Sequence, residues 1–406
     1  MRRALANHPA PGALAILAFA AVSVLAGSLL ASCSHPVTIE PRSPTRSSTA
    51  TPASSPAPGL RSDGAGRGPS GAESERPASP SNSEGAAAAP TVPAGAEPWS
   101  YDGADGRVYV TASARIHSTL AVGSLDRALP SFVERAVSHY RTALCELPAP
   151  RDPLETYIFG TRSQWERHTR ERLGSSAGPY LAMGKGGFTT EGDAILYDIG
   201  PLDTLTIIAH EGWHQYTQRT FKQPLPLWLE EGVACWMEAV RPGRGQSASS
   251  PFMPWRNHER FSELRNGARR GDLIPLEALL DSSPEQFLRQ GKDRMLLYYA
   301  QVWALVHFLR EGENGRYAEA LRTLLLDASE GTLHARMQNS QIFPNSKARS
   351  MHLQSRVGKW VLLEYFNPRF SEFKDQYEKF LKQVTQPSAA QRVWQGESPA
   401  QAPPAN

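Results

Sequence analysis

The spacing of apolar residues divides the chain, from about residue 98 onward, into a first part with short strands and a second part with helices. Four short stretches are alternating or continuously apolar, as strands are: residues 107–112, 154–159, 187–190 and 194–198. Six longer stretches have helical spacing: residues 125–147, 163–173, 294–310, 316–326, 356–365 and 373–384. We therefore predict an α+β fold, with a small mixed sheet in an upper lobe and a mainly helical lower lobe.

The first 33 residues have the pattern of an export signal. Arg2 and Arg3 precede an uncharged apolar run over residues 13–30. Leu30-Ala31-Ser32-Cys33 then resembles a lipobox, which implies a signal peptide over residues 1–32 and acylation of Cys33. An uncleaved anchor helix, barely long enough to span a bilayer, and a plain secretory signal remain open. The resemblance, with Ser34 after the cysteine, implies an exported outer-membrane lipoprotein held to the membrane by its lipid.

Composition separates the rest of the chain into three parts. Residues 33–97 are rich in Pro, Ser, Ala, Gly and Thr, and such a segment cannot bury enough apolar surface to offset its ordering entropy. We predict a disordered tether there, a folded domain over residues 98–385, and a disordered tail over residues 386–406. The folded part is long enough for one substantial core or two small lobes.

The chemistry centres on the motif H-E-x-x-H formed by His210, Glu211 and His214. In a helix, residues i and i+4 share a face, so both imidazoles can reach one zinc ion at roughly 2.0–2.1 Å. Glu211 can reach a water molecule on that ion. The apolar run 204–209 predicts a buried helix, where these groups are costly unless they are paired or bind a metal. A helix with two histidines unrelated to metal is the alternative.

A second helix should begin at Pro226, because proline suits the first turn of a helix. It contains Glu231, 17 positions after His214, which leaves room for a loop and for packing against the first helix. Glu231 is therefore a candidate third ligand, and a fourth position would stay open for water.

These two segments, H-E-x-x-H followed by W-L-x-E-G-x-A, resemble the gluzincin metallopeptidases of the peptidase MA-like superfamily. The resemblance implies a zincin-like fold, zinc as cofactor and Glu231 as the third ligand. Residues 156–161, the Gly-rich strand before the motif and residues 299–306 extend the likeness to the bacterial DUF1570 type, over roughly residues 105–320. It also implies that an edge strand, at residues 186–190 or 194–198, pairs with extended substrate.

The implied reaction is hydrolysis of a peptide bond, with Glu211 as general base toward a zinc-activated water. By the same resemblance a residue on a later helix steadies the oxyanion: Tyr299 is our candidate, with Tyr298 and His307 behind it. A core tyrosine is the alternative for Tyr299. Glu238 is on the same helical face as Glu231 and should support the histidines, whereas Glu230 should point elsewhere. Some relatives carry a carboxylate where this chain has Cys235, which leaves the support of the ligands open.

Other features limit the function. The net charge of +3 is small and no basic stripe with aromatics is present, so nucleic-acid binding has no support. Cys145 and Cys235 could pair in an exported protein, but free buried cysteines are the interpretation we favour. Three functions remain: a zinc peptidase of the bacterial cell envelope, a zinc amidase acting on cell-wall crosslinks, and a tethered binding protein on an inactive peptidase scaffold. Intact Glu211 speaks against the last, and the oligomeric state is open.

Overall fold

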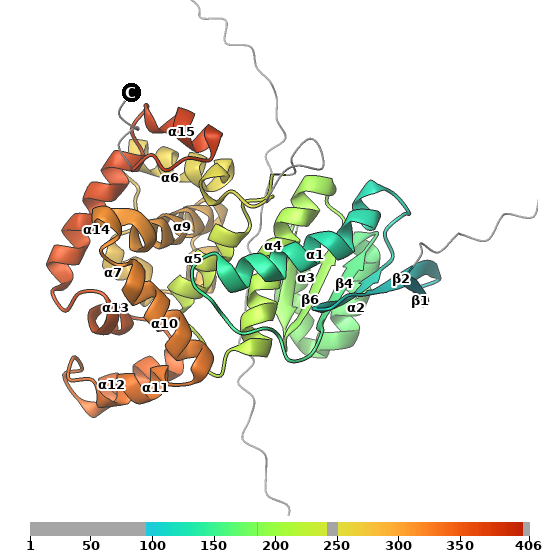
Figure 1. Ribbon diagram of the computed structural model, residues 1–406, viewed down its shortest axis with the longest axis horizontal. Helices are drawn as coiled ribbons and strands as arrows, with labels where there is room; N and C mark the ends of the chain where they lie inside the picture. The colour runs from blue at the N-terminus through green and yellow to red at the C-terminus, as the bar shows by residue number, and fades with distance from the viewer. Residues whose placement is uncertain (1–94, 185, 242–250, 401–406) are drawn as a thin grey trace, which may run out of the picture. The chain divides into compact units, whose positions relative to one another are not determined.

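The computed structural model describes residues 95–184, 186–241 and 251–400 (Figure 1). The signal peptide, Cys33 and nearly all of the expected tether lie outside the described residues. Within them, a sheet with its covering helices is followed by a mainly helical part, so the predicted α+β class is confirmed. No helix among these residues is both long and apolar enough to cross a membrane.

The sheet is mixed and has six strands. In chain order the strands are β1 Ala96–Tyr101, β2 Ala104–Val110, β3 Ala114–Ser118, β4 Leu154–Phe159, β5 Gly187–Thr190 and β6 Asp193–Tyr197. Their order in space is β1-β2-β3-β4-β6-β5. The pairs β3–β4 and β4–β6 are parallel and the others antiparallel. Strands β1 and β3 were not predicted, and β1 begins two residues before the expected domain boundary.

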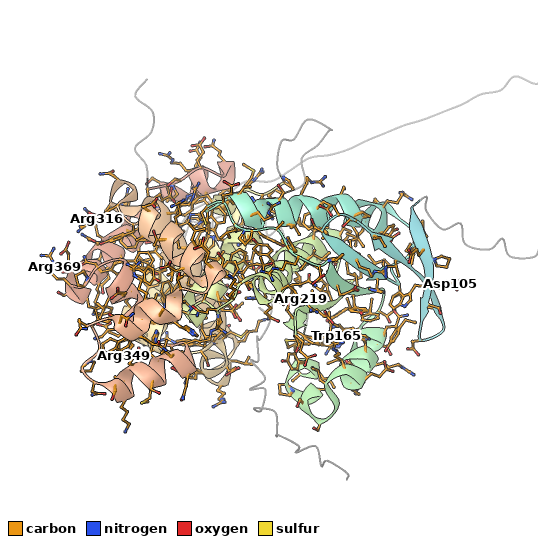
Figure 2. All side chains as sticks on the ribbon, turned by 60° about the horizontal axis from the view of Figure 1, so that its bottom comes forward. Asp105, Trp165, Arg219, Arg316, Arg349 and Arg369 are labelled. Carbon is orange, nitrogen blue, oxygen red and sulfur yellow. The ribbon has the colours of Figure 1, made fainter. Side chains whose placement is uncertain are left out.

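Alternation along the strands gives the sheet two apolar faces. In β6, Ala194 and Leu196 join the core with helices α1 Ser124–Thr142 and α4 Pro201–Thr220. Ile195 and Tyr197 join a second core under α2 Arg162–Leu173, which holds Trp165 (Figure 2). Helices therefore cover both faces of the sheet. Helix α2 is followed by two short helices, η1 Gly174–Ala177 and α3 Gly178–Leu181.

The second part of the chain is helical and packs around α9. Its helices are α5 Leu227–Met237, η2 Pro254–Arg256, α6 His258–Arg270, α7 Leu276–Asp281, α8 Pro284–Arg289, α9 Lys292–Gly315, α10 Ala318–Glu330, α11 Leu333–Asn339, α12 Ser346–Ser355, α13 Trp360–Tyr365, α14 Phe370–Val384 and α15 Ala389–Gln395. Helix α9 contacts α5, α6, α7, α8, α10 and α14, and every residue of 295–309 is buried. This one helix thus lies at the centre of the core of the helical part.

Two expectations about the helical part differ from the structure. Residues 356–365 are not one helix, because Arg356 and Gly358 have φ of 58° and 106°, which ends α12 before α13 begins. Residues 386–400 are not a frayed tail, since α15 lies there with Ala389 and Val393 buried. The composition of this segment led to the wrong prediction, because a few apolar residues are enough for one short helix to pack on an existing core.

Two glycines allow the helices that carry the motifs to approach their neighbours. A Cβ on Gly212 would lie 2.5 Å from the Tyr140 hydroxyl of α1, which hydrogen-bonds to the Ala209 carbonyl of α4. A Cβ on Gly232 would lie 2.7 Å from the Val302 carbonyl oxygen of α9. The contact between α5 and α9 therefore depends on a missing side chain at residue 232.

We predict that Gly232→Ala destabilises the fold by about 1–3 kcal/mol, because the added methyl group must push α5 and α9 apart. The measurement is the free energy of unfolding of the purified full chain in urea. Gly178→Ala is the matched control: Gly178 is also helical, and a Cβ there meets no atom within 4 Å. Equal losses in the two variants would contradict the close packing of α5 on α9.

Candidate metal centre

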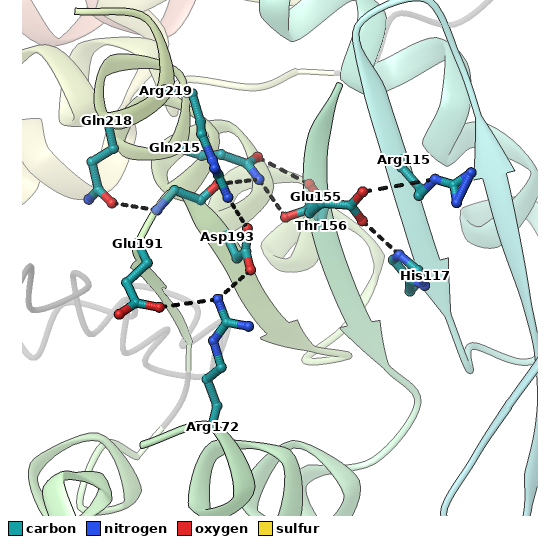
Figure 3. Close-up of polar contacts among 11 residues, drawn as sticks. Arg115, His117, Glu155, Thr156, Arg172, Glu191, Asp193, Gln215, Gln218 and Arg219 are labelled. Atoms are coloured by element: carbon teal, nitrogen blue, oxygen red, sulfur yellow. Dashed lines mark hydrogen bonds and ion pairs between the residues drawn. The ribbon is translucent and has the colours of Figure 1, made fainter. Parts of the chain in front are cut away.

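Helix α4 is held against the sheet by polar contacts along its second half (Figure 3). Gln215 donates to the Glu155 carbonyl of β4, and Gln218 accepts from the Gly192 backbone amide. Arg219 forms an ion pair with Asp193 of β6 at 2.6 Å. These contacts, together with Pro201 in the first turn, fix the rotation of α4 and direct its motif residues toward α5.

The structure brings the three predicted ligands together between α4 and α5. Glu231 Oε2 lies 3.7 Å from His210 Nε2 and 3.6 Å from His214 Nε2. All three residues are at most 3% exposed. Among the described residues, none of these three atoms has a hydrogen-bond partner. Three buried polar atoms therefore converge on one point without satisfying one another, which is costly unless something else binds there.

The donor set fits a divalent metal such as zinc. Two ligand atoms at 2.0–2.2 Å from a tetrahedral ion are roughly 3.4 Å apart, close to the separations in the structure. Both histidines also contact a carboxylate through Nδ1, which places the proton on Nδ1 and leaves the Nε2 lone pair free for a metal. Two imidazoles and one carboxylate supply three of the four donors of a tetrahedral ion, whereas structural zinc sites supply all four from the protein.

His210 is oriented by a buried network that ends on α6. Its Nδ1 lies 2.7 Å from Glu238 Oε2, so the predicted contact with Glu238 is confirmed. The Glu238 carboxylate also accepts from Arg260 Nε at 2.8 Å and from Asn257 Nδ2 at 2.9 Å. Although burial raises the pKa of Glu238, the Arg260 guanidinium and His210 lower it to about 2. Arg260 and Asn257 were not predicted, because no sequence pattern joins residues about twenty positions beyond the α5 motif to it.

His214 is oriented by Glu230, and here the expectation that Glu230 points elsewhere is wrong. Glu230 Oε1 lies 3.1 Å from His214 Nδ1 and accepts a hydrogen bond from the Thr217 hydroxyl at 2.8 Å. Residues 230 and 231 do leave α5 in different directions. However, the imidazole ring of His214 has a nitrogen on each of two sides. Glu230 therefore contacts Nδ1 while Glu231 faces Nε2 of the same ring.

Glu211 lies beside the ligands with one oxygen held and one unpartnered. The Thr189 hydroxyl of β5 is 2.9 Å from Glu211 Oε2 and 2.9 Å from its carbonyl oxygen. Glu211 Oε1 has no hydrogen-bond partner among the described residues, and the residue is 1% exposed. Burial raises the pKa of Glu211 above its ordinary value, against the neighbouring histidines. The strand before the motif thus orients the carboxylate, a role that the sequence did not indicate for Thr189.

The site as a whole favours positive charge. Burial raises the pKa of Glu231, but His214 and His210 lower it to about 2. Burial lowers the pKa of His214, yet Glu231 and Glu230 raise it to about 10. Negatively charged carboxylates surround the two imidazole rings. A divalent cation would balance this negative charge in place of the protons on the histidines.

A second group, His210 Nδ1 with Cys235 and Glu238, also has its potential ligand atoms within 4.8 Å of one another. It is a poor metal site, because Glu238 already accepts from Arg260 and Asn257 and the Arg260 cation lies beside it. Cys145 and Cys235 are both free and buried, as favoured. Cys235 therefore packs beside His210 without taking over the role of a carboxylate.

The three candidates for oxyanion stabilisation lie in different surroundings on α9. Tyr299 is fully buried, 6.3 Å from the His210 ring, with the Arg260 guanidinium 5.2 Å from its own ring centre. The Tyr298 hydroxyl is buried without a hydrogen-bond partner among the described residues. Burial and the charge of Glu231 raise the pKa of Tyr298 well above its ordinary value, so it stays protonated. His307 instead stacks on Trp255 at 3.7 Å.

The two candidate substrate strands are now distinguished. Strand β6 pairs with β4 and β5 on its two sides, whereas β5 is the last strand of the sheet in the described part of the chain. Strand β5 also carries Thr189, which contacts Glu211. Of the two expected edges, residues 186–190 are the one at the end of the sheet.

Comparison with known proteins finds one family model that overlaps this site. A family model described as "Protein of unknown function (DUF1570)" matches residues 204–328, less than a third of the chain. The matched segment holds the whole ligand group and α9, so the DUF1570 likeness is confirmed there. No curated protein matches the chain.

We predict that Glu238→Leu destabilises the protein by about 3–5 kcal/mol, because it leaves the fully buried Arg260 cation unpaired. The double variant Glu238→Leu/Arg260→Met should lose less than the single one, since both charges are then removed. Urea unfolding of the full chain measures both. Glu319→Leu, which breaks the exposed pair with Arg322, is the control and should cause no measurable loss. A double variant worse than Glu238→Leu would contradict the pairing.

Proposed function

We propose that this protein is a zinc-dependent peptidase of the gluzincin type, which hydrolyses peptide or protein substrates in the bacterial cell envelope. One observation carries the proposal: His210 Nε2, His214 Nε2 and Glu231 Oε2 converge, buried and unpartnered among the described residues, beside the free oxygen of Glu211. Ligands alone would serve a structural ion, but a buried carboxylate beside an open position is the arrangement of a hydrolase.

His210, His214 and Glu231 would hold the zinc ion. When bound, the ion would lower the pKa of a water molecule to about 7 and draw electrons from the carbonyl to be cleaved. Glu211 accepts the proton of the attacking water on its free oxygen and passes it to the leaving amine. Thr189 keeps the other oxygen in place, so the carboxylate faces the ligands in one orientation.

Tyr298 is the donor that we assign to the oxygen on which charge develops. Its hydroxyl is buried and unpartnered among the described residues, and it lies on α9, which packs against the helix that carries Glu231. Such a donor costs little to reorient when the reaction begins. Tyr299, the candidate from the sequence, holds Arg260 over its ring, which favours a role in supporting the Glu238–His210 contact.

Two other functions use the same residues. A zinc amidase acting on cell-wall crosslinks would need the same ligands and base. Strand β5, at the end of the sheet, favours an extended peptide as substrate over a cell-wall crosslink, because an extended peptide can pair with a strand edge. An inactive scaffold would not need the buried Glu211 carboxylate, whose burial is otherwise a cost.

The location remains part of the proposal. The lipobox-like residues Leu30 to Cys33 support export and anchoring by a lipid on Cys33, with the catalytic part held to the outer membrane by the intervening segment. All of these residues lie outside the described residues.

We predict that the purified full chain binds one zinc ion and cleaves an unfolded protein, and that Glu211→Gln keeps the zinc but loses cleavage by about 10²–10⁴-fold. Metal analysis and a gel-based cleavage assay measure the two properties. Glu319→Gln, exposed on α10, is the matched control. Zinc without cleavage in either protein would favour a non-peptide substrate. No zinc even after reconstitution would overturn the ligand assignment.

The two tyrosines should separate by kinetics. We predict that Tyr298→Phe lowers kcat about 10²–10³-fold with KM nearly unchanged, because it removes a hydrogen bond made in the transition state. Tyr299→Phe should change kcat far less, since the ring that carries Arg260 remains. The reverse order would return the oxyanion role to Tyr299. Zinc content, measured in both variants, must stay at the wild-type level.

A further inference from the structure

The segment between α12 and α13 is fastened directly to the start of α5, the helix that carries Glu230 and Glu231. The Leu227 amide donates to the Arg356 carbonyl at 3.1 Å, and Arg356 Nε donates to the Leu225 carbonyl at 2.7 Å. Leu227 precedes Glu231 by four residues, roughly 6 Å along the helix axis. Arg356 is therefore attached about one turn from the candidate metal ligand.

The backbone at Arg356 is held in a costly conformation. Its φ of 58° and ψ of 15° are left-handed, which an arginine adopts only under constraint. His352 Nδ1 donates to the Val357 carbonyl at 2.8 Å, and the Gly358 amide donates to the Leu280 carbonyl at 2.7 Å. Contacts on both sides thus fix the residue, and strain held in this way is typical of functional positions.

The guanidinium keeps free donors. Its Nε is used by Leu225, but Nη1 and Nη2 form no hydrogen bond or ion pair with any residue of 95–184, 186–241 or 251–400. Neither terminal nitrogen is among the fully buried atoms, and the residue as a whole is half-buried. A fixed arginine therefore presents two donors that a ligand can reach.

The charges near Arg356 are those of the candidate site. Burial lowers the pKa of Arg356, and the carboxylates of Glu230 and Glu231 act in the opposite direction. Both carboxylates already have partners, Glu230 in His214 and Thr217 and Glu231 in the ligand group. The other nearby cation, Arg260, is neutralised by Glu238. Arg260 is thus paired with a carboxylate, whereas Arg356 forms no ion pair with any of the described residues.

We propose that Arg356 is a specificity-determining residue that binds a carboxylate of the substrate close to the bond to be cleaved. The planar pair of terminal nitrogens matches a carboxylate, which can accept both hydrogen bonds at once. The carboxylate comes either from the C-terminus of the peptide or from an aspartate or glutamate side chain. This inference rests on the proposed function for its substrate, and its test below separates the two.

The test is binding to the full-length, zinc-loaded Glu211→Gln protein, which does not turn substrate over. Three fluorescent peptides of one sequence are compared by anisotropy: one with a free C-terminal carboxylate, its C-terminal amide, and an amide in which one uncharged residue is replaced by aspartate. We expect at least one carboxylate peptide to bind about 10–100-fold more tightly than the plain amide. Which of the two binds more tightly identifies the source of the carboxylate.

Substitution then assigns that preference to Arg356. Arg356→Met and Arg356→Gly should abolish it, and the glycine variant also relieves the left-handed backbone, so misfolding does not account for the loss. Arg349→Met is the matched control and should retain the preference, because Arg349 also lies on α12 (Figure 2) but donates to the Ser340 carbonyl. Thermal unfolding and zinc content check that each variant is folded.

Two results would overturn the proposal: no preference for either carboxylate peptide when Arg356 is intact, or a preference that survives Arg356→Met. Cleavage is scored separately, with Glu211 restored. If the wild type binds carboxylate through Arg356 but cleaves none of the peptides, the peptidase proposal fails while the role of Arg356 stands. If it cleaves all three peptides equally, with no difference in binding, the peptidase stands and the role of Arg356 fails.

Discussion

The burial of two histidines and four glutamates at the contact of α4 and α5 is the constraint on which the rest of the structure depends. Each of these groups is expensive in an apolar interior unless it has a partner. The fold satisfies the outer atoms, through Glu238 on His210 and Glu230 on His214, and leaves the inner atoms facing one another. The centre is therefore prepared for a cation rather than for a further side chain.

Around this centre the fold supplies support from three directions. The sheet orients the carboxylate of the motif through Thr189, and α6 carries Arg260, which fixes Glu238. Helix α9 packs so closely on α5 that only a glycine fits at residue 232. Rigid elements on these three sides keep the candidate ligand atoms in place, as the proposed catalytic role would require.

Much of this arrangement could be predicted from local patterns. The strand at 154–159, the helices at 163–173 and 373–384, and the meeting of His210, His214 and Glu231 follow from hydrophobic spacing and helical geometry. The break at Arg356 could not be predicted, because that residue has no left-handed preference of its own. Its conformation is held in part by hydrogen bonds to Leu225 and Leu227, which lie more than a hundred positions earlier in the chain.

The sequence by itself determined which residues could bind a metal, since two histidines one helical turn apart must share a face. Only the tertiary structure decided what surrounds them. Arg260 reaches Glu238, the Tyr298 hydroxyl is left without a partner among the described residues, and β5 rather than β6 ends the sheet. Such relations depend on how distant helices and strands pack. Packing is set by the sum of many weak contacts, so it leaves no local signal in the chain.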